Sequence, residues 1–66
     1  MLRAFWIRRS PHFLTEVRIE VRYLREVHGM EAYHRAMERA RDPRMHSFRR
    51  MVARAAAKTI GKPRVL

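Results

Sequence analysis

The chain has 66 residues, no cysteine, and 16 Lys and Arg against 6 Asp and Glu, a formal net charge of +10. A chain of this length forms at most one small domain with a limited core. The absence of cysteine excludes disulfides, thiol catalysis and thiolate metal sites. No stretch approaches the roughly 20 apolar residues of a membrane helix. We therefore expect one cytoplasmic domain over residues 1–66, without a membrane span.

The charge is uneven along the chain. Residues 1–33 carry 6 basic and 4 acidic side chains, whereas residues 34–66 carry 10 and 2. Fourteen of the 16 basic residues are arginine, whose planar guanidinium suits phosphate and carboxylate groups. This bias favours an anionic partner, either nucleic acid or an acidic protein surface. A solvated basic surface without a partner is the plainer alternative.

Start and stop signals divide the chain into helices. Ser10-Pro11 is typical of an N-cap followed by proline at the first helical position, and Asp42-Pro43 repeats this signal. Gly29 and Gly61 are natural helix ends. We expect an all-α fold, a small three-helix domain. The expected helices span about residues 11–28, 30–41 and 43–60.

Apolar residues at helical spacing predict which face of each helix is buried. In the first helix these are Phe13, Leu14, Val17, Val21, Leu24 and His28. In the second they are Met30, Tyr33, Met37 and Ala40. In the third they are Met45, Phe48, Val52, Ala55, Ala56 and Thr59.

Residues 16–23 also allow a different interpretation. Charged residues alternate strictly here with Val17, Ile19, Val21 and Tyr23, which is the period of a half-buried strand. The helix signals on both sides favour a helix. The strand stays open as an alternative.

The third expected helix carries the strongest binding pattern. Arg50, Arg54 and Lys58 recur every four residues, with Arg44 near the same side and Lys62 continuing the charge. The row is about 12 Å long at 1.5 Å per residue, and no acidic residue follows Asp42. Such a row can follow phosphates in a salt-sensitive manner that is not sequence-specific. An ordinary exposed helix face is the alternative.

The two ends of the chain are basic as well. Residues 1–9 combine large apolar side chains with arginine, and residues 61–66 form a basic tail. The N-terminal arm either folds back onto the helices or anchors a partner protein, because aromatic and arginine side chains dominate interface hot spots. The second interpretation gives an alternative function, an accessory subunit of a larger assembly. The predicted anchor residues are Phe5, Trp6, Arg8 and Arg9.

Catalytic and metal-binding patterns are weak. The two glycines cannot form a phosphate-binding loop. Glu31, His34 and Glu38 share one helix face, but di-metal bundles need two such Glu-x-x-His pairs and further carboxylates. We expect these side chains to be solvated, and the protein to be a non-enzyme without metal or cofactor.

Two resemblances bear on the fold. The run from Tyr23 to Ala32, followed by Ala36 and Ala40, resembles a pattern in short bacterial helical proteins of unknown function. In these proteins one helix ends in His-Gly and the next has an alanine-rich face. The resemblance covers about residues 17–60. It implies a small helical fold and no function.

The strand alternative resembles the ribbon-helix-helix DNA-binding dimers. In that family a short N-terminal strand pairs with its copy from a second chain and enters the major groove, and two helices follow. The resemblance implies that Arg18, Glu20 and Arg22 would read bases in a homodimeric regulator. Residues 30–41 and 43–60 would then be its helices.

Overall fold

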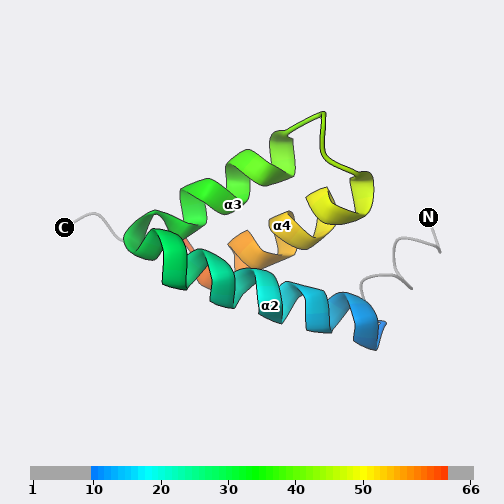
Figure 1. The fold of residues 1–66 in the computed structure, drawn as a ribbon, viewed down its shortest axis with the longest axis horizontal. Coiled ribbons are helices and arrows are strands. Elements are labelled where there is room, and N and C mark those ends of the chain that lie inside the picture. Colours follow the sequence, from blue (N-terminus) through cyan, green and yellow to red (C-terminus); the bar gives the residue numbers. More distant parts are fainter. Residues whose placement is uncertain (1–9, 63–66) are drawn as a thin grey trace.

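The computed structural model describes residues 10–62, which form helices joined by short connections (Figure 1). Helix α2 spans Pro11–His28, η1 is a 3-10 turn at Gly29–Glu31, α3 spans Ala32–Arg41 and α4 spans Ser47–Ile60. The all-α class is confirmed, and the described residues contain no strand. Within the same part of the chain, no helix is long and apolar enough to cross a bilayer.

Local chemistry at both ends sets the limits of α2. The Ser10 hydroxyl oxygen accepts a hydrogen bond from the Phe13 N–H at 3.1 Å, and Pro11 occupies the first turn. At the other end Gly29 has φ +56°, a conformation that residues with a Cβ rarely adopt. The helix therefore begins and ends where these residues predict.

The strand predicted as an alternative for residues 16–23 is wrong, because the whole segment lies inside α2. The alternation arises because α2 has apolar residues on two sides. Val17 and Val21 are buried, whereas Ile19 and Tyr23 are 56% and 48% exposed. The N-terminal strand that a ribbon-helix-helix dimer requires is therefore absent from this segment.

Helix α3 starts two residues later than expected, and of the four residues predicted to be buried only Ala40 is buried. Met30, predicted to be buried, is 91% exposed in η1. Tyr33 and Met37 are half-buried at the edge of the core. The buried face is made of alanines, which let neighbouring helix backbones approach closely. These residues are Ala32, Ala36 and Ala40.

The expected helix start at Asp42-Pro43 is also wrong. Asp42 Oδ1 instead accepts a hydrogen bond from the Arg44 N–H at 2.9 Å, and the side chain closes a turn of the Asx type. Helix α4 begins at Ser47, after His46, whose Nδ1 accepts from the Phe48 N–H at 3.2 Å. At the far end the helix stops before Gly61, as predicted.

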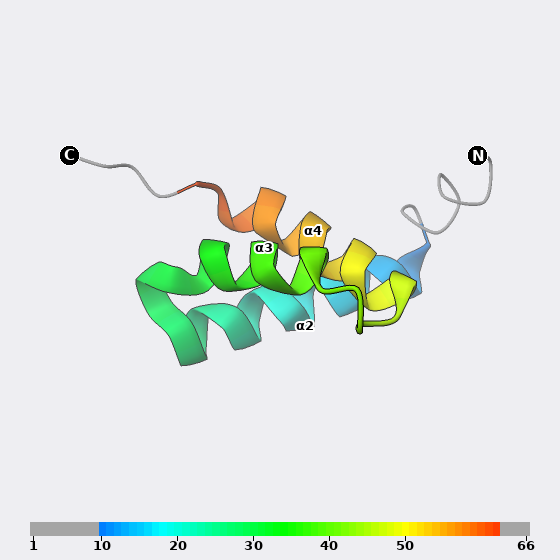
Figure 2. The ribbon, with the colours of Figure 1, turned by 90° about the horizontal axis from the view of Figure 1, so that it is seen from above.

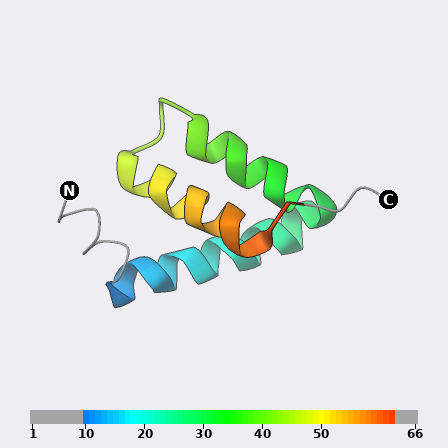
Figure 3. The ribbon, with the colours of Figure 1, turned by 180° about the vertical axis from the view of Figure 1, so that it is seen from behind.

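Helix α4 lies against both other helices. Figures 1 and 3 show α3 and α4 as an antiparallel hairpin, with α4 between α3 and α2. Figure 2, from above, shows the orange end of α4 to one side of α3, whereas its yellow start lies level with the end of α3. One groove is lined by residues of α4 and α2, and another by residues of α4 and α3.

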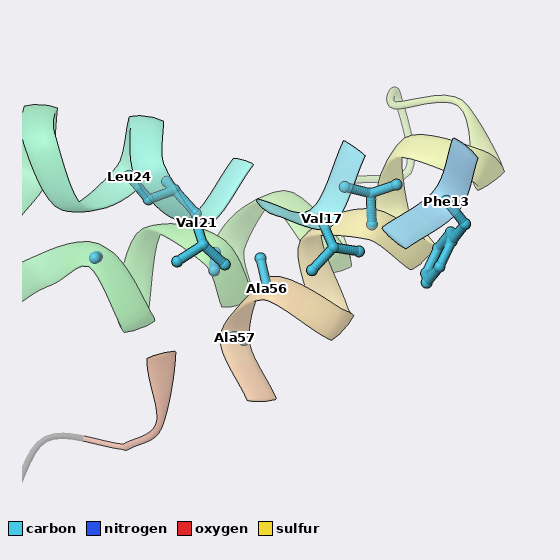
Figure 4. Close-up of a cluster of buried hydrophobic side chains, with 9 residues drawn as sticks. Phe13, Val17, Val21, Leu24, Ala56 and Ala57 are labelled. Atoms are coloured by element: carbon cyan, nitrogen blue, oxygen red, sulfur yellow. The ribbon is translucent and has the colours of Figure 1, made fainter. Parts of the chain in front are cut away.

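Apart from Phe13, the core consists of small and medium-sized apolar side chains (Figure 4). Leu24 and Val52 are the largest side chains that are fully buried in the described residues. The buried face of α4 differs from the predicted one, because Thr59 is exposed and Ala55 half-buried. The buried residues of α4 are Val52, Ala53, Ala56 and Ala57.

Candidate functional site

The acidic residues of the chain are occupied by internal ion pairs. All six lie between residues 16 and 42, within the described part. Each carboxylate has a guanidinium nitrogen at 2.6–3.9 Å, supplied by five arginines in total. The pairs are Glu16–Arg49, Glu20–Arg39, Glu26–Arg22, Glu31–Arg35, Glu38–Arg35 and Asp42–Arg44.

This pairing divides the cations of residues 10–62 into two groups. Those in the first group neutralise an acid within the molecule. Those in the second group have no ion pair among the described residues. The second group consists of Arg18, Arg25, Arg41, Arg50, Arg54, Lys58 and Lys62.

Arg44, predicted to belong to the basic row, lies outside α4. Its Nε is 3.3 Å from Asp42 Oδ1, in addition to the backbone hydrogen bond. These contacts hold the pKa of the Asp42 carboxyl below its ordinary value of 3.8, and the backbone hydrogen bond from Arg44 has the largest effect. The charge of Arg44 is thus balanced locally by Asp42.

The other four residues of the predicted row follow α4 and its end. Arg54 and Lys58 are exposed one turn apart, and Lys62 is exposed just after Gly61. Arg50 is half-buried, and its Nε is buried without a hydrogen-bond partner. The cation nearest the start of α4 is therefore half-buried, and those farther along are exposed.

The structure adds Arg41, a residue that the sequence analysis missed. Arg41 is the last residue of α3, and it lies on the same side of that helix as Tyr33 and Met37, at four-residue spacing. The packing of α3 against α4 brings Arg41 next to the cations of α4, and the spacing along the sequence does not contain this relationship.

Arg41 and the α4 cations line one groove between α3 and α4. Its volume is about 520 Å³, and it has four cations and no carboxylate in its lining. A smaller hollow of about 230 Å³ adjoins it at Arg54 and reaches Ser47 and Arg50. We call Arg41, Arg50, Arg54, Lys58 and Lys62 the basic surface. The groove floor is formed by Tyr33, Met37, Ala57 and Gly61.

The basic surface can hold an anion by charge and by the donors of its guanidinium and ammonium groups. The predicted anchor residues Phe5, Trp6, Arg8 and Arg9 lie outside the described residues, as does Arg64 of the tail. Within residues 10–62 no group of three His, Asp or Glu side chains is placed to hold a metal ion. Glu31 and Glu38 instead both contact Arg35.

The chain was compared with known protein families, curated proteins and solved structures. No family model matches it, and neither a curated protein nor a solved structure matches.

Proposed function

We propose that the chain acts as one non-enzymatic, three-helix domain that binds the phosphate backbone of nucleic acid through the basic surface. The observation that carries this proposal is the pairing pattern. Every acid already has an arginine partner, and five of the seven cations left unpaired lie on α3, on α4 or directly after α4. No carboxylate lines the hollows between these helices to repel a polyanion.

The shape of the basic surface supports an extended ligand. Arg50 and Lys58 are separated by eight residues of helix, about 12 Å along the axis. This distance matches three to four base pairs of duplex at about 3.4 Å each. Guanidinium contacts to phosphates position a protein without reading bases. We therefore expect binding that depends on salt and little on sequence.

Fluorescence anisotropy with a labelled 20-base-pair DNA duplex between 50 and 200 mM salt tests the proposal. Neutralising about four phosphates gives a slope of log K against log salt of about −3.6. The Arg54→Gln/Lys58→Gln variant removes two of these charges, so its slope falls to about −1.8. Both side chains are exposed, so the fold tolerates the change.

The matched control is Arg18→Gln/Arg25→Gln. It removes the same net charge from two exposed cations of α2 that also lack an ion pair. This variant keeps the slope of the unaltered protein within about half a unit. If the two double variants lose affinity equally, binding follows net charge and the basic surface is not the site. No duplex binding at 50 mM salt would also contradict the proposal, and would favour an acidic protein surface as the partner.

A further inference from the structure

The side of α4 that faces α2 carries a second groove, distinct from the one toward α3. Two hollows of about 580 and 270 Å³ share Leu14, Val17 and Thr59, so they form one continuous groove. We call it the α2/α4 groove. Its floor is apolar, and its α2 side follows Leu14, Val17 and Val21 at helical spacing. Met51 and Ala55 complete the floor from α4.

Cations stand on both rims of this groove. Arg18, Arg22 and Arg25 line the α2 side, and Arg54 and Lys58 line the α4 side. The lining contains one acid, Glu26, and Arg22 already pairs with it at 3.4 Å. The groove thus offers an apolar strip between two rows of cations, in which Arg18, Arg25, Arg54 and Lys58 have no ion pair among the described residues.

We propose that the α2/α4 groove binds an acidic amphipathic helix of a partner protein. Such a helix lays its apolar face on the floor and directs carboxylates to the cations on either side, as in helix-in-groove recognition. The α2 side from Leu14 to Arg25 is about 16 Å long at 1.5 Å per residue, which accommodates about three turns of helix. Leu14 is 46% exposed and is the floor residue with the most surface to bury.

Charge complementarity selects this occupant over segments of the chain itself. Residues 1–9 contain three arginines and no acid, and a second copy brings a net charge of +10. Either would place arginine against the arginines of the rims. The acids that a second copy could offer are already paired with its own arginines. An acidic partner has neither disadvantage.

The test uses a fluorescein-labelled, 15-residue helical peptide with leucines along one face and glutamate elsewhere. A second peptide has the same composition but its leucines are spread around the helix. We expect the full-length protein to bind the first peptide at least tenfold more tightly than the second. Equal binding of the two peptides would show charge attraction alone and would overturn the proposal.

Leu14→Gln and Ile19→Gln form a matched pair of variants. Both replace an exposed apolar residue of α2, but only Leu14 lines the groove. We expect Leu14→Gln to weaken peptide binding about tenfold, since it removes most of one apolar side chain from the contact. Ile19→Gln should stay within twofold. Circular dichroism checks that both variants keep the helical content, and equal effects of the two would overturn the proposal.

Two further results would assign the groove to another occupant. In sedimentation equilibrium, a dimer that Leu14→Gln dissociates would place a second copy there. An increase of tenfold or more in peptide affinity on Phe5→Ser/Trp6→Ser would place residues 1–9 in the groove. A monomer with unchanged peptide affinity in the second variant supports the acidic partner. None of these measurements uses nucleic acid, so their outcome is independent of the outcome of the duplex experiment.

Discussion

Arg39 Nε lies 2.6 Å from Glu20 Oε2 and connects α3 to the buried middle of α2. Glu20 is 7% exposed, and its geometry with Arg39 is that of a close ion pair without hydrogen-bond alignment. Neither of the two atoms has a hydrogen-bond partner. The buried Glu20 carboxylate therefore depends on Arg39 for its counter-charge.

Removing one partner of this pair should be more harmful than removing both. Arg39→Ala leaves the Glu20 carboxylate buried without a counter-charge, and we expect a loss of about 2 kcal/mol in the free energy of unfolding. This lies below the usual range for a buried pair because the Arg39 side chain is 38% exposed. Glu20→Leu/Arg39→Met should recover most of the loss. Urea denaturation followed by circular dichroism measures both.

Arg22→Ala is the control, since it breaks the Arg22–Glu26 pair, whose side chains are 82% and 69% exposed. An exposed i,i+4 pair contributes only about 0.3–0.5 kcal/mol. If Arg39→Ala and Arg22→Ala lower the free energy of unfolding by the same amount, the burial of Glu20 does not strengthen the contribution of its ion pair to stability.

Asp42 should contribute an acid-sensitive part of the stability. The hydrogen bonds from the Arg44 backbone and side chain lower its pKa in the folded state below 3.8. A lowered pKa means that the stabilisation is present above the unfolded pKa and is lost as the pH falls through the folded one. The Tm of the protein should therefore exceed that of Asp42→Asn at pH 6.

This difference in Tm should shrink as the pH falls below about 3.8 and continue to shrink through the lowered pKa. Thermal melts at several pH values measure it directly. The comparison of two chains that differ at one position cancels the titration of the other carboxylates. A difference that stays constant down to pH 2 would show that the Asp42 charge is irrelevant to the turn.

The acidic peptide and the DNA duplex should exclude each other. Arg54 and Lys58 belong to the lining of both grooves on α4, so a ligand in one neutralises cations that the other ligand needs. A saturating amount of the peptide should displace labelled duplex. Leu14→Gln should raise the peptide concentration needed for displacement about tenfold, without changing duplex affinity.

Arg41→Gln provides the reverse control, since Arg41 lines only the groove toward α3. It should weaken duplex binding and leave peptide binding within twofold. Formation of a ternary complex, seen as a slower species in anisotropy or sedimentation, would contradict mutual exclusion.

The sequence predicted best those features that local chemistry controls. The limits of α2 depend on Ser10, Pro11 and Gly29, all within a few residues of the helix ends. Asp42-Pro43 was misleading because an aspartate before proline serves equally well in an N-cap and in an Asx turn. The ring nitrogen of His46 caps α4 instead. Histidine is not among the residues that N-cap preferences favour.

The buried faces were harder to predict because they depend on how closely the helices approach. On α3 the larger side chains Tyr33 and Met37 appeared to be the core, but close packing of helices selects Ala32 and Ala36. The row of Arg54 and Lys58 followed from four-residue spacing alone. The roles of Arg41 and of the cations beside the α2/α4 groove could not be predicted from periodicity, because they depend on how the helices are placed relative to one another.

The complete pairing of the acids has a consequence for how the molecule meets a partner. In residues 10–62 the ion pairs balance most of the paired charge over short distances, and five of the seven unpaired cations lie on or next to α3 and α4, so the positive charge is unevenly distributed. A polyanion then exerts a torque on the approaching molecule over about 10 Å at moderate salt. For the nucleic-acid binding proposed above, this torque should turn the basic surface toward the polyanion before contact, and electrostatic steering should then raise the association rate.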